Sequence, residues 1–97
     1  MASIEEELVF ARQTKVTIEG KRTERAIEVL REAYRIVGTQ PTVYIPLRDV
    51  RHKVGFALLP VIIGLEQGQK NQGDINNAKS AIEAWIKELE GSTYRRR

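Results

Sequence analysis

The chain has 97 residues, of which 41% are hydrophobic and 30% are charged, as in one ordinary globular domain rather than a disordered or fibrous protein. It contains no cysteine, which excludes disulfides, thiolate metal sites and cysteine nucleophiles. The formal net charge is +3, and the positive charge is concentrated between residues 21 and 54. Such an uneven distribution favours attraction to phosphate groups.

The acidic N-terminal residues and the longest apolar run together predict the compartment. Glu5, Glu6 and Glu7 stand where a secretory signal would have a basic start and an apolar stretch, so we expect no export peptide. The longest apolar run, residues 56–65, is much shorter than the roughly 20 residues that cross a bilayer. We therefore expect a cytoplasmic protein with no membrane partner.

The first part of the chain predicts two helices and a short strand. Ser3 and Glu6 form a capping-box pattern at the start of a helix over residues 4–13. Apolar and polar residues alternate over residues 16–19, which favours a strand. Helical spacing of apolar residues then predicts a core helix over residues 23–37.

The next segment predicts a strand that leads into a basic helix. Residues 43–45 carry β-branched side chains at alternate positions, and Pro46 suits the first turn of a helix over residues 47–54. Gly55 is expected to end this helix. Its apolar residues share one face, and basic residues surround the rest. The basic residues are Arg48, Arg51, His52 and Lys53.

The remaining sequence predicts a broken element followed by a C-terminal helix. Pro60 and two glycines oppose a long helix over residues 56–69, so we expect a short helix from near Pro60, with a buried strand over residues 61–63 as the alternative. Residues 70–74 are polar and predict an internal linker in which Asp74 caps the next helix.

An apolar stripe centred on Trp85 predicts that next helix over residues 75–90, ending at Gly91. Residues 92–97 are expected to form a flexible basic tail. Together these elements predict a single globular domain over residues 1–91.

The middle of the chain resembles the opening of a winged-helix or helix-turn-helix DNA-binding domain, over roughly residues 23–69. The residues that match are Val43, Ile45, Leu47, Arg48 and Val50, with residues 58–65 in the place of the third helix. The resemblance implies a mainly α single domain with one or two short strands and, here, an added C-terminal helix. Residues 56–65 contain no Arg, Lys, Asn or Gln to read base edges, and no wing is evident. We therefore expect contact with the phosphate backbone.

The leading hypothesis is a small nucleic-acid-binding protein, with DNA or RNA as partner. The predicted binding residues are Arg48, Arg51, Lys53, Lys70, Arg95, Arg96 and Arg97. A solvated helix face and a solubilising tail are the alternatives for these groups. The single histidine has no partner for catalysis or metal binding, so we predict no enzyme, no catalytic residue, no metal site and no cofactor.

The alternative hypothesis is a protein-interaction or assembly module with no nucleic-acid role. The apolar residues 56–65 and the stripe around Trp85 exceed what a 97-residue core is expected to hide, which predicts a subunit interface and a C2 dimer. The predicted interface residues are Ile82, Trp85 and Leu89. The position of Trp85 discriminates: packing on Leu30 and Tyr34 would complete one core, whereas exposure would imply a partner.

Overall fold

Four helices account for nearly all of the residues that the computed structural model describes, which are 3–20, 24–39, 45–69 and 71–95. The helices are α1 (Ile4–Glu19), α2 (Glu24–Thr39), α3 (Ile45–Glu66) and α4 (Gln72–Arg95). No strand occurs in the described ranges. The mainly helical prediction is therefore confirmed, and the predicted short strands are wrong.

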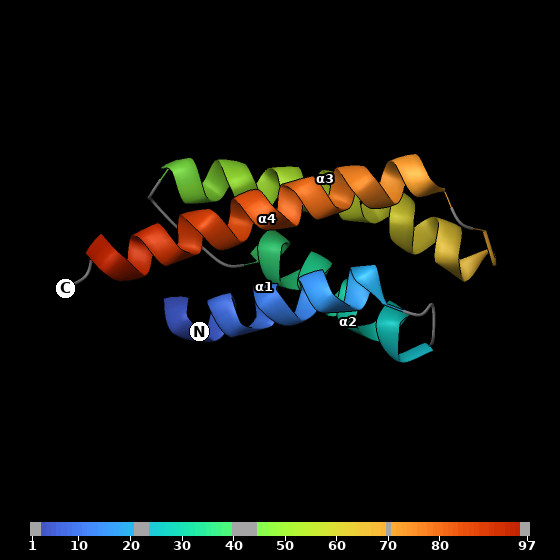
Figure 1. The fold of residues 1–97 in the computed structure, drawn as a ribbon, viewed down its shortest axis with the longest axis horizontal. Helices are drawn as coiled ribbons and strands as arrows, with labels where there is room; N and C mark the ends of the chain where they lie inside the picture. The colour runs from blue at the N-terminus through green and yellow to red at the C-terminus, as the bar shows by residue number, and fades with distance from the viewer. Residues whose placement is uncertain (1–2, 21–23, 40–44, 70, 96–97) are drawn as a thin grey trace.

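The helices run alternately up and down the long axis of a bundle that measures 43 × 20 × 20 Å (Figure 1). α1 packs against α2 and α4, and α3 packs against the same two helices. The pairs α1–α3 and α2–α4 therefore lie diagonally across the core. This is the arrangement of a four-helix bundle rather than of a winged helix, in which a strand and a hairpin accompany the helices.

α1 begins as predicted but continues further. The side chain of Ser3 accepts a hydrogen bond from the Glu6 backbone N–H at 3.1 Å, which is the expected cap. The predicted strand over residues 16–19 is wrong because Ile18 extends the buried face of the helix, while Val16 is 71% exposed. Thr14 is compatible with this helix because its buried hydroxyl donates to the carbonyl of Phe10.

α3 is one helix of 22 residues, although breaks were predicted at Gly55 and Pro60. Its buried residues continue through both positions, so packing against α2 and α4 outweighs the local preferences. Pro60 lies on the exposed side, where its ring meets solvent rather than the core. The strand alternative for residues 61–63 is wrong. Of the strand predicted at 43–45, Ile45 begins α3 and residues 43–44 lie outside the described residues.

α4 is longer than predicted at both ends. It begins at Gln72, after a turn that includes Gly68 at φ +71°, and it passes through Gly91 as far as Arg95. Asn71, not Asp74, caps it, since the Asn71 side chain accepts the backbone N–H of Asp74 at 3.0 Å. The predicted tail is therefore helical over residues 92–95, and residues 96–97 lie outside the described part.

The core is a single cluster that runs the length of the bundle, and Trp85 is among its largest fully buried side chains. Ile82 and Leu89 are also fully buried within the chain. The chain's own helices cover these three residues, so the predicted interface residues have no exposed surface in the bundle. Trp85 and Leu30 belong to the same cluster, so α4 completes one core, whereas Tyr34 is 40% exposed.

Candidate functional site

A buried polar cluster joins three helices in the interior of the bundle. Arg51 of α3 donates from Nε and Nη2 to the two carboxylate oxygens of Glu7 in α1, at 2.9 and 2.5 Å. The indole Nε1 of Trp85 in α4 donates to Oε2 of the same carboxylate at 2.8 Å. The side chains of Arg51 and Glu7 are only 4% and 1% exposed.

This cluster is structural rather than reactive. The planar guanidinium meets the carboxylate in a two-bond arrangement, so each charge is neutralised by the other and both are held in place. The remaining bond to Glu7 comes from an indole N–H, which is not a proton donor in catalysis. The cluster fixes how α1, α3 and α4 are aligned.

The predicted basic site is dispersed in the structure. Arg51 lies inside the bundle and presents no charge at the surface. Arg48 and Lys53 are exposed on α3, with the exposed carboxylate of Asp49 between them in the sequence. Arg95 is the last residue of α4, but its side chain is outside the description, as are Lys70, Arg96 and Arg97. The described residues thus bring none of the predicted nucleic-acid contacts together.

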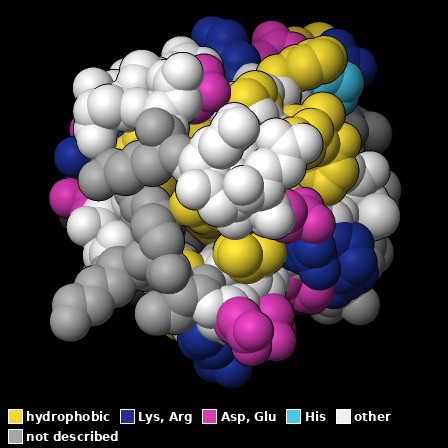
Figure 2. All heavy atoms as spheres, turned by 90° about the vertical axis from the view of Figure 1, so that its right-hand side faces the viewer, with side chains coloured by type: hydrophobic (Ala, Val, Ile, Leu, Met, Phe, Trp, Pro, Cys, Tyr) yellow, Lys and Arg dark blue, Asp and Glu magenta, His cyan; other side chains and the backbone are white. Residues whose placement is uncertain are grey.

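Apolar side chains instead form an exposed band along α3, on the side opposite the core. They recur with His52 and Asp49 at spacings of three and four residues, so all of them share one helix face. We call this face the α3 outer face; it consists of Ile45, Asp49, His52, Phe56, Leu59 and Ile63. Phe56 is 78% exposed and Ile63 is 46% exposed. Figure 2 shows hydrophobic side chains gathered along one side of the molecule, close to the histidine.

A groove of about 360 Å³ runs beside this face, between α2 and α3. Tyr34 and Leu59 form part of its apolar lining, and Phe56 stands at its edge. A Cβ built on Gly38 would meet nothing within 4 Å, and one built on Gly55 would lie 3.6 Å from Val37 Cγ2. The two glycines therefore leave the groove open. We call it the α2–α3 groove.

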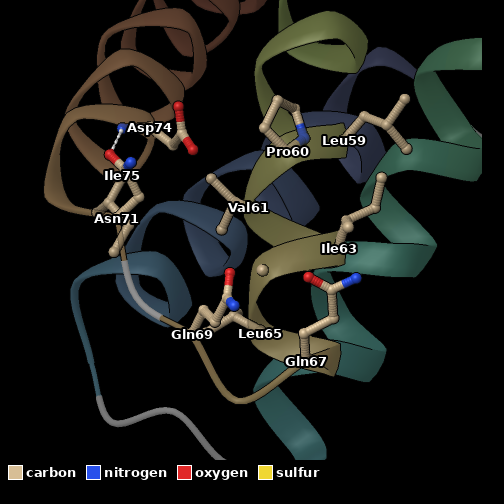
Figure 3. Close-up of a pocket in the computed structure, with 11 residues that line it drawn as sticks. Leu59, Pro60, Val61, Ile63, Leu65, Gln67, Gln69, Asn71, Asp74 and Ile75 are labelled. Carbon is tan, nitrogen blue, oxygen red and sulfur yellow. Dashed lines mark hydrogen bonds between the residues drawn. The ribbon is translucent and has the colours of Figure 1, made fainter.

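Two further hollows adjoin the same face. One, of about 470 Å³, lies between α3 and α4, where Phe56 faces the small side chains of Ser80, Ala81 and Ala84. The other, of about 380 Å³, lies where α3 ends and α4 begins, as Figure 3 shows. Among the described residues that line this hollow, Asp74 is the only carboxylate, so they offer no acid–base pair of carboxylates.

Ion pairs border α2. Arg31 pairs with Glu66 at the end of α3, which ties the two helices together at the surface. Arg35 pairs with Glu32 one turn away on α2. The hydrogen bond from Arg35 lowers the pKa of Glu32 below its ordinary value, and the carboxylate in turn raises the pKa of Arg35. Both side chains are in water, so these shifts describe surface pairing and not a reactive site.

Two features are absent from the described residues. They contain no group of three or more His, Cys, Asp and Glu side chains placed to hold a metal ion. None of the four helices, as far as they are described, combines the length and apolarity needed to cross a membrane.

Comparisons with known proteins found no match to this chain among protein-family models, curated proteins or solved structures.

Sequence reasoning missed the buried cluster although signals for it exist. Glu7 lies four residues before Ala11, and Arg51 lies four residues after Leu47, so each falls on a buried helix face. Two opposite charges on buried faces predict a pair, because an isolated buried charge is very costly. The α3 outer face was missed because residues 47–54 and 56–69 were treated as separate elements.

Proposed function

We propose that the protein is a helical interaction module that binds another protein surface through the α3 outer face. The observation that carries this proposal is the exposure of Phe56, Leu59 and Ile63 on a helix whose opposite side is already buried in the core. Contiguous exposed apolar side chains of this kind mark binding surfaces in soluble proteins.

The composition of α3 supports the proposal. A helix that serves only the core of a small bundle needs one apolar stripe, with polar residues on its other side. α3 instead carries apolar residues all round over its second half, and α2 and α4 cover only part of them. A helix of this type is normally enclosed on all sides, so the free side of α3 suits a partner. The dimer expected from the sequence is the simplest assembly that would supply one.

The nucleic-acid hypothesis has less support from the described surface. Its central residue, Arg51, is buried in an ion pair with Glu7. Arg48 and Lys53 lie on either side of the acidic residue Asp49 in the sequence. Phosphate binding depends on several cations acting over one continuous surface. Between Arg48 and Lys53 the outer face carries Asp49 and His52, and neither a lysine nor an arginine.

The test is photo-crosslinking in the cells that produce the protein. The photoreactive residue p-benzoylphenylalanine replaces Phe56 in one variant and Val16 in a matched control. Val16 is also apolar and is 71% exposed, but it belongs to α1. We expect illumination to give a protein adduct at position 56 and none at position 16. Adducts to nucleic acid alone, or equal protein adducts at both positions, would refute the proposed function.

A further inference from the structure

We infer that the partner of the α3 outer face is a second copy of this chain, bound antiparallel about a two-fold axis, with Phe56 of each copy seated in the α2–α3 groove of the other. This inference rests on the proposed function and names its partner.

The face carries both a projection and the hollow that fits it. Phe56 is the most exposed large hydrophobic residue of the described chain, and it stands at the edge of the α2–α3 groove. In a two-fold dimer the same patch meets itself, so every projection must find its hollow on the same surface. Phe56 and the groove meet this condition. A different protein could bind with a projection or a hollow alone, so it would not require both on this face.

The groove is large enough for an aromatic ring. Its volume is about 360 Å³, and an apolar cavity of about 150 Å³ is known to hold benzene. Gly38 and Gly55 place no side chain in the way of an approaching ring, and Tyr34 and Leu59 provide apolar walls. Aromatic pairs add attraction beyond the area they bury, so Tyr34 is a suitable neighbour for the incoming phenylalanine.

Charge along α3 favours the antiparallel direction. Arg48 lies near the start of the helix and Glu66 at its end, on the same side of the outer face. An antiparallel pair centred near Phe56 sets Arg48 of one copy beside Glu66 of the other, where it joins the pair that Glu66 makes with Arg31. In a parallel pair, Arg48 would instead lie level with Arg48 of the other copy, and Glu66 level with Glu66. The opposed helix dipoles of an antiparallel pair also favour that form.

The first test is the mass of the purified full chain over a wide concentration range, measured by light scattering and sedimentation. We expect a dimer of twice 11.1 kDa at high concentration. Phe56→Glu should raise the dissociation constant of the dimer on the order of 100-fold. Phe56→Ala should raise this constant less, and Val16→Glu should leave it unchanged. Circular dichroism controls for folding, and Phe56→Ala, which adds no charge, serves if the glutamate variant fails to fold.

The second test measures direction. The chain has no cysteine, so a single Gln67→Cys variant carries one spin label per copy. Residue 67 lies eleven positions beyond Phe56, so antiparallel helices with a rise of 1.5 Å per residue separate the labels by roughly 30 Å. A parallel pair would hold them within about half of that distance. Electron–electron double resonance distinguishes the two, and the short distance would overturn the inference.

The outcomes separate this inference from the proposed function. A protein that stays monomeric at every concentration, or a dimer that Val16→Glu disrupts and Phe56→Glu does not, overturns the second copy as partner. If position 56 nevertheless forms an adduct with a different protein in cells, the proposed function stands without it. If position 56 forms no protein adduct, both fail.

Discussion

The buried cluster of Glu7, Arg51 and Trp85 makes a sharp prediction about stability. Glu7→Gln keeps the size of the side chain but removes the negative charge that Glu7 places against the buried guanidinium of Arg51. Breaking a buried pair from one side costs about 3 to 5 kcal/mol. A domain of this size has a free energy of unfolding of roughly 5 to 15 kcal/mol, so the variant should lose a large part of its stability.

The size of the loss follows from the geometry. Arg51 makes two charge-assisted hydrogen bonds to Glu7, and only 4% of its side chain reaches solvent, so water cannot replace the lost carboxylate. In urea, where small proteins show slopes of about 1 to 3 kcal/mol per molar, the midpoint should fall by roughly 2 M. Trp85 fluorescence reports unfolding at the cluster and circular dichroism reports the loss of helix, so both signals should follow the same transition.

Two variants complete this experiment. Glu90→Gln breaks the exposed pair with Arg12 and should cost at most about 1 kcal/mol. Glu7→Leu combined with Arg51→Met removes both charges and should recover most of the loss, since apolar side chains can replace a buried pair at little cost. If Glu7→Gln unfolds within about 1 kcal/mol of the parent, as Glu90→Gln should, the cluster does not hold the bundle together and the reasoning is wrong.

Three further predictions follow. Trp85→Ala should destabilise the protein by about 3 to 5 kcal/mol, because the ring is fully buried, and the parent should show the blue-shifted fluorescence of a buried indole; a solvated spectrum would contradict this. Arg35→Ala should raise the pKa of Glu32 toward its ordinary value, as measured by NMR titration. Because the folded pKa is lowered, the contribution of this pair is present at neutral pH and is lost as the pH falls through that pKa; an unchanged pKa would exclude the pairing in solution. In a salt titration with duplex DNA, single strands and RNA, we expect the Arg48→Ala, Lys53→Ala double variant to give the same result as the parent. Binding that falls steeply as salt rises and that is lost in the double variant would restore the nucleic-acid hypothesis.

The helices were predictable where one local signal was strong and no other opposed it. The Ser3 cap and the start of α1 are as predicted, and the expected helix over residues 23–37 differs from α2 by a residue or two at each end. In both places the apolar period and the end signals agree. Such agreement between local levels is what makes a segment predictable.

α3 was not predictable from local signals because packing decides it. Pro60 and Gly55 each carry a known free-energy cost inside a helix. The sequence does not show how much apolar surface the helix buries on either side of these two positions, and this burial outweighs the cost. Once Val54, Leu58 and Val61 are buried by two neighbouring helices, the helix continues through both positions. Dividing α3 also hid the band of apolar residues on its outer face.

The sequence alone did not show which of the charged residues lie inside the bundle. Arg51 is formally a surface cation, and only the placement of Glu7 across the bundle shows that it is internal. Contacts between residues 44 positions apart are a property of the fold. The predicted interface was based on residues 56–65 and on the stripe around Trp85, but Trp85 is fully buried in the core of the bundle, whereas Phe56 is 78% exposed.

The most direct test of the α3 outer face as a binding surface is the identity of the adduct formed by p-benzoylphenylalanine at position 56. Mass spectrometry of the digested adduct identifies both the partner and the peptide attached. We expect a protein adduct, attached at residues 34–38 of a second copy, where the α2–α3 groove lies. An unmodified chain, or a nucleotide attached at position 56, would contradict it.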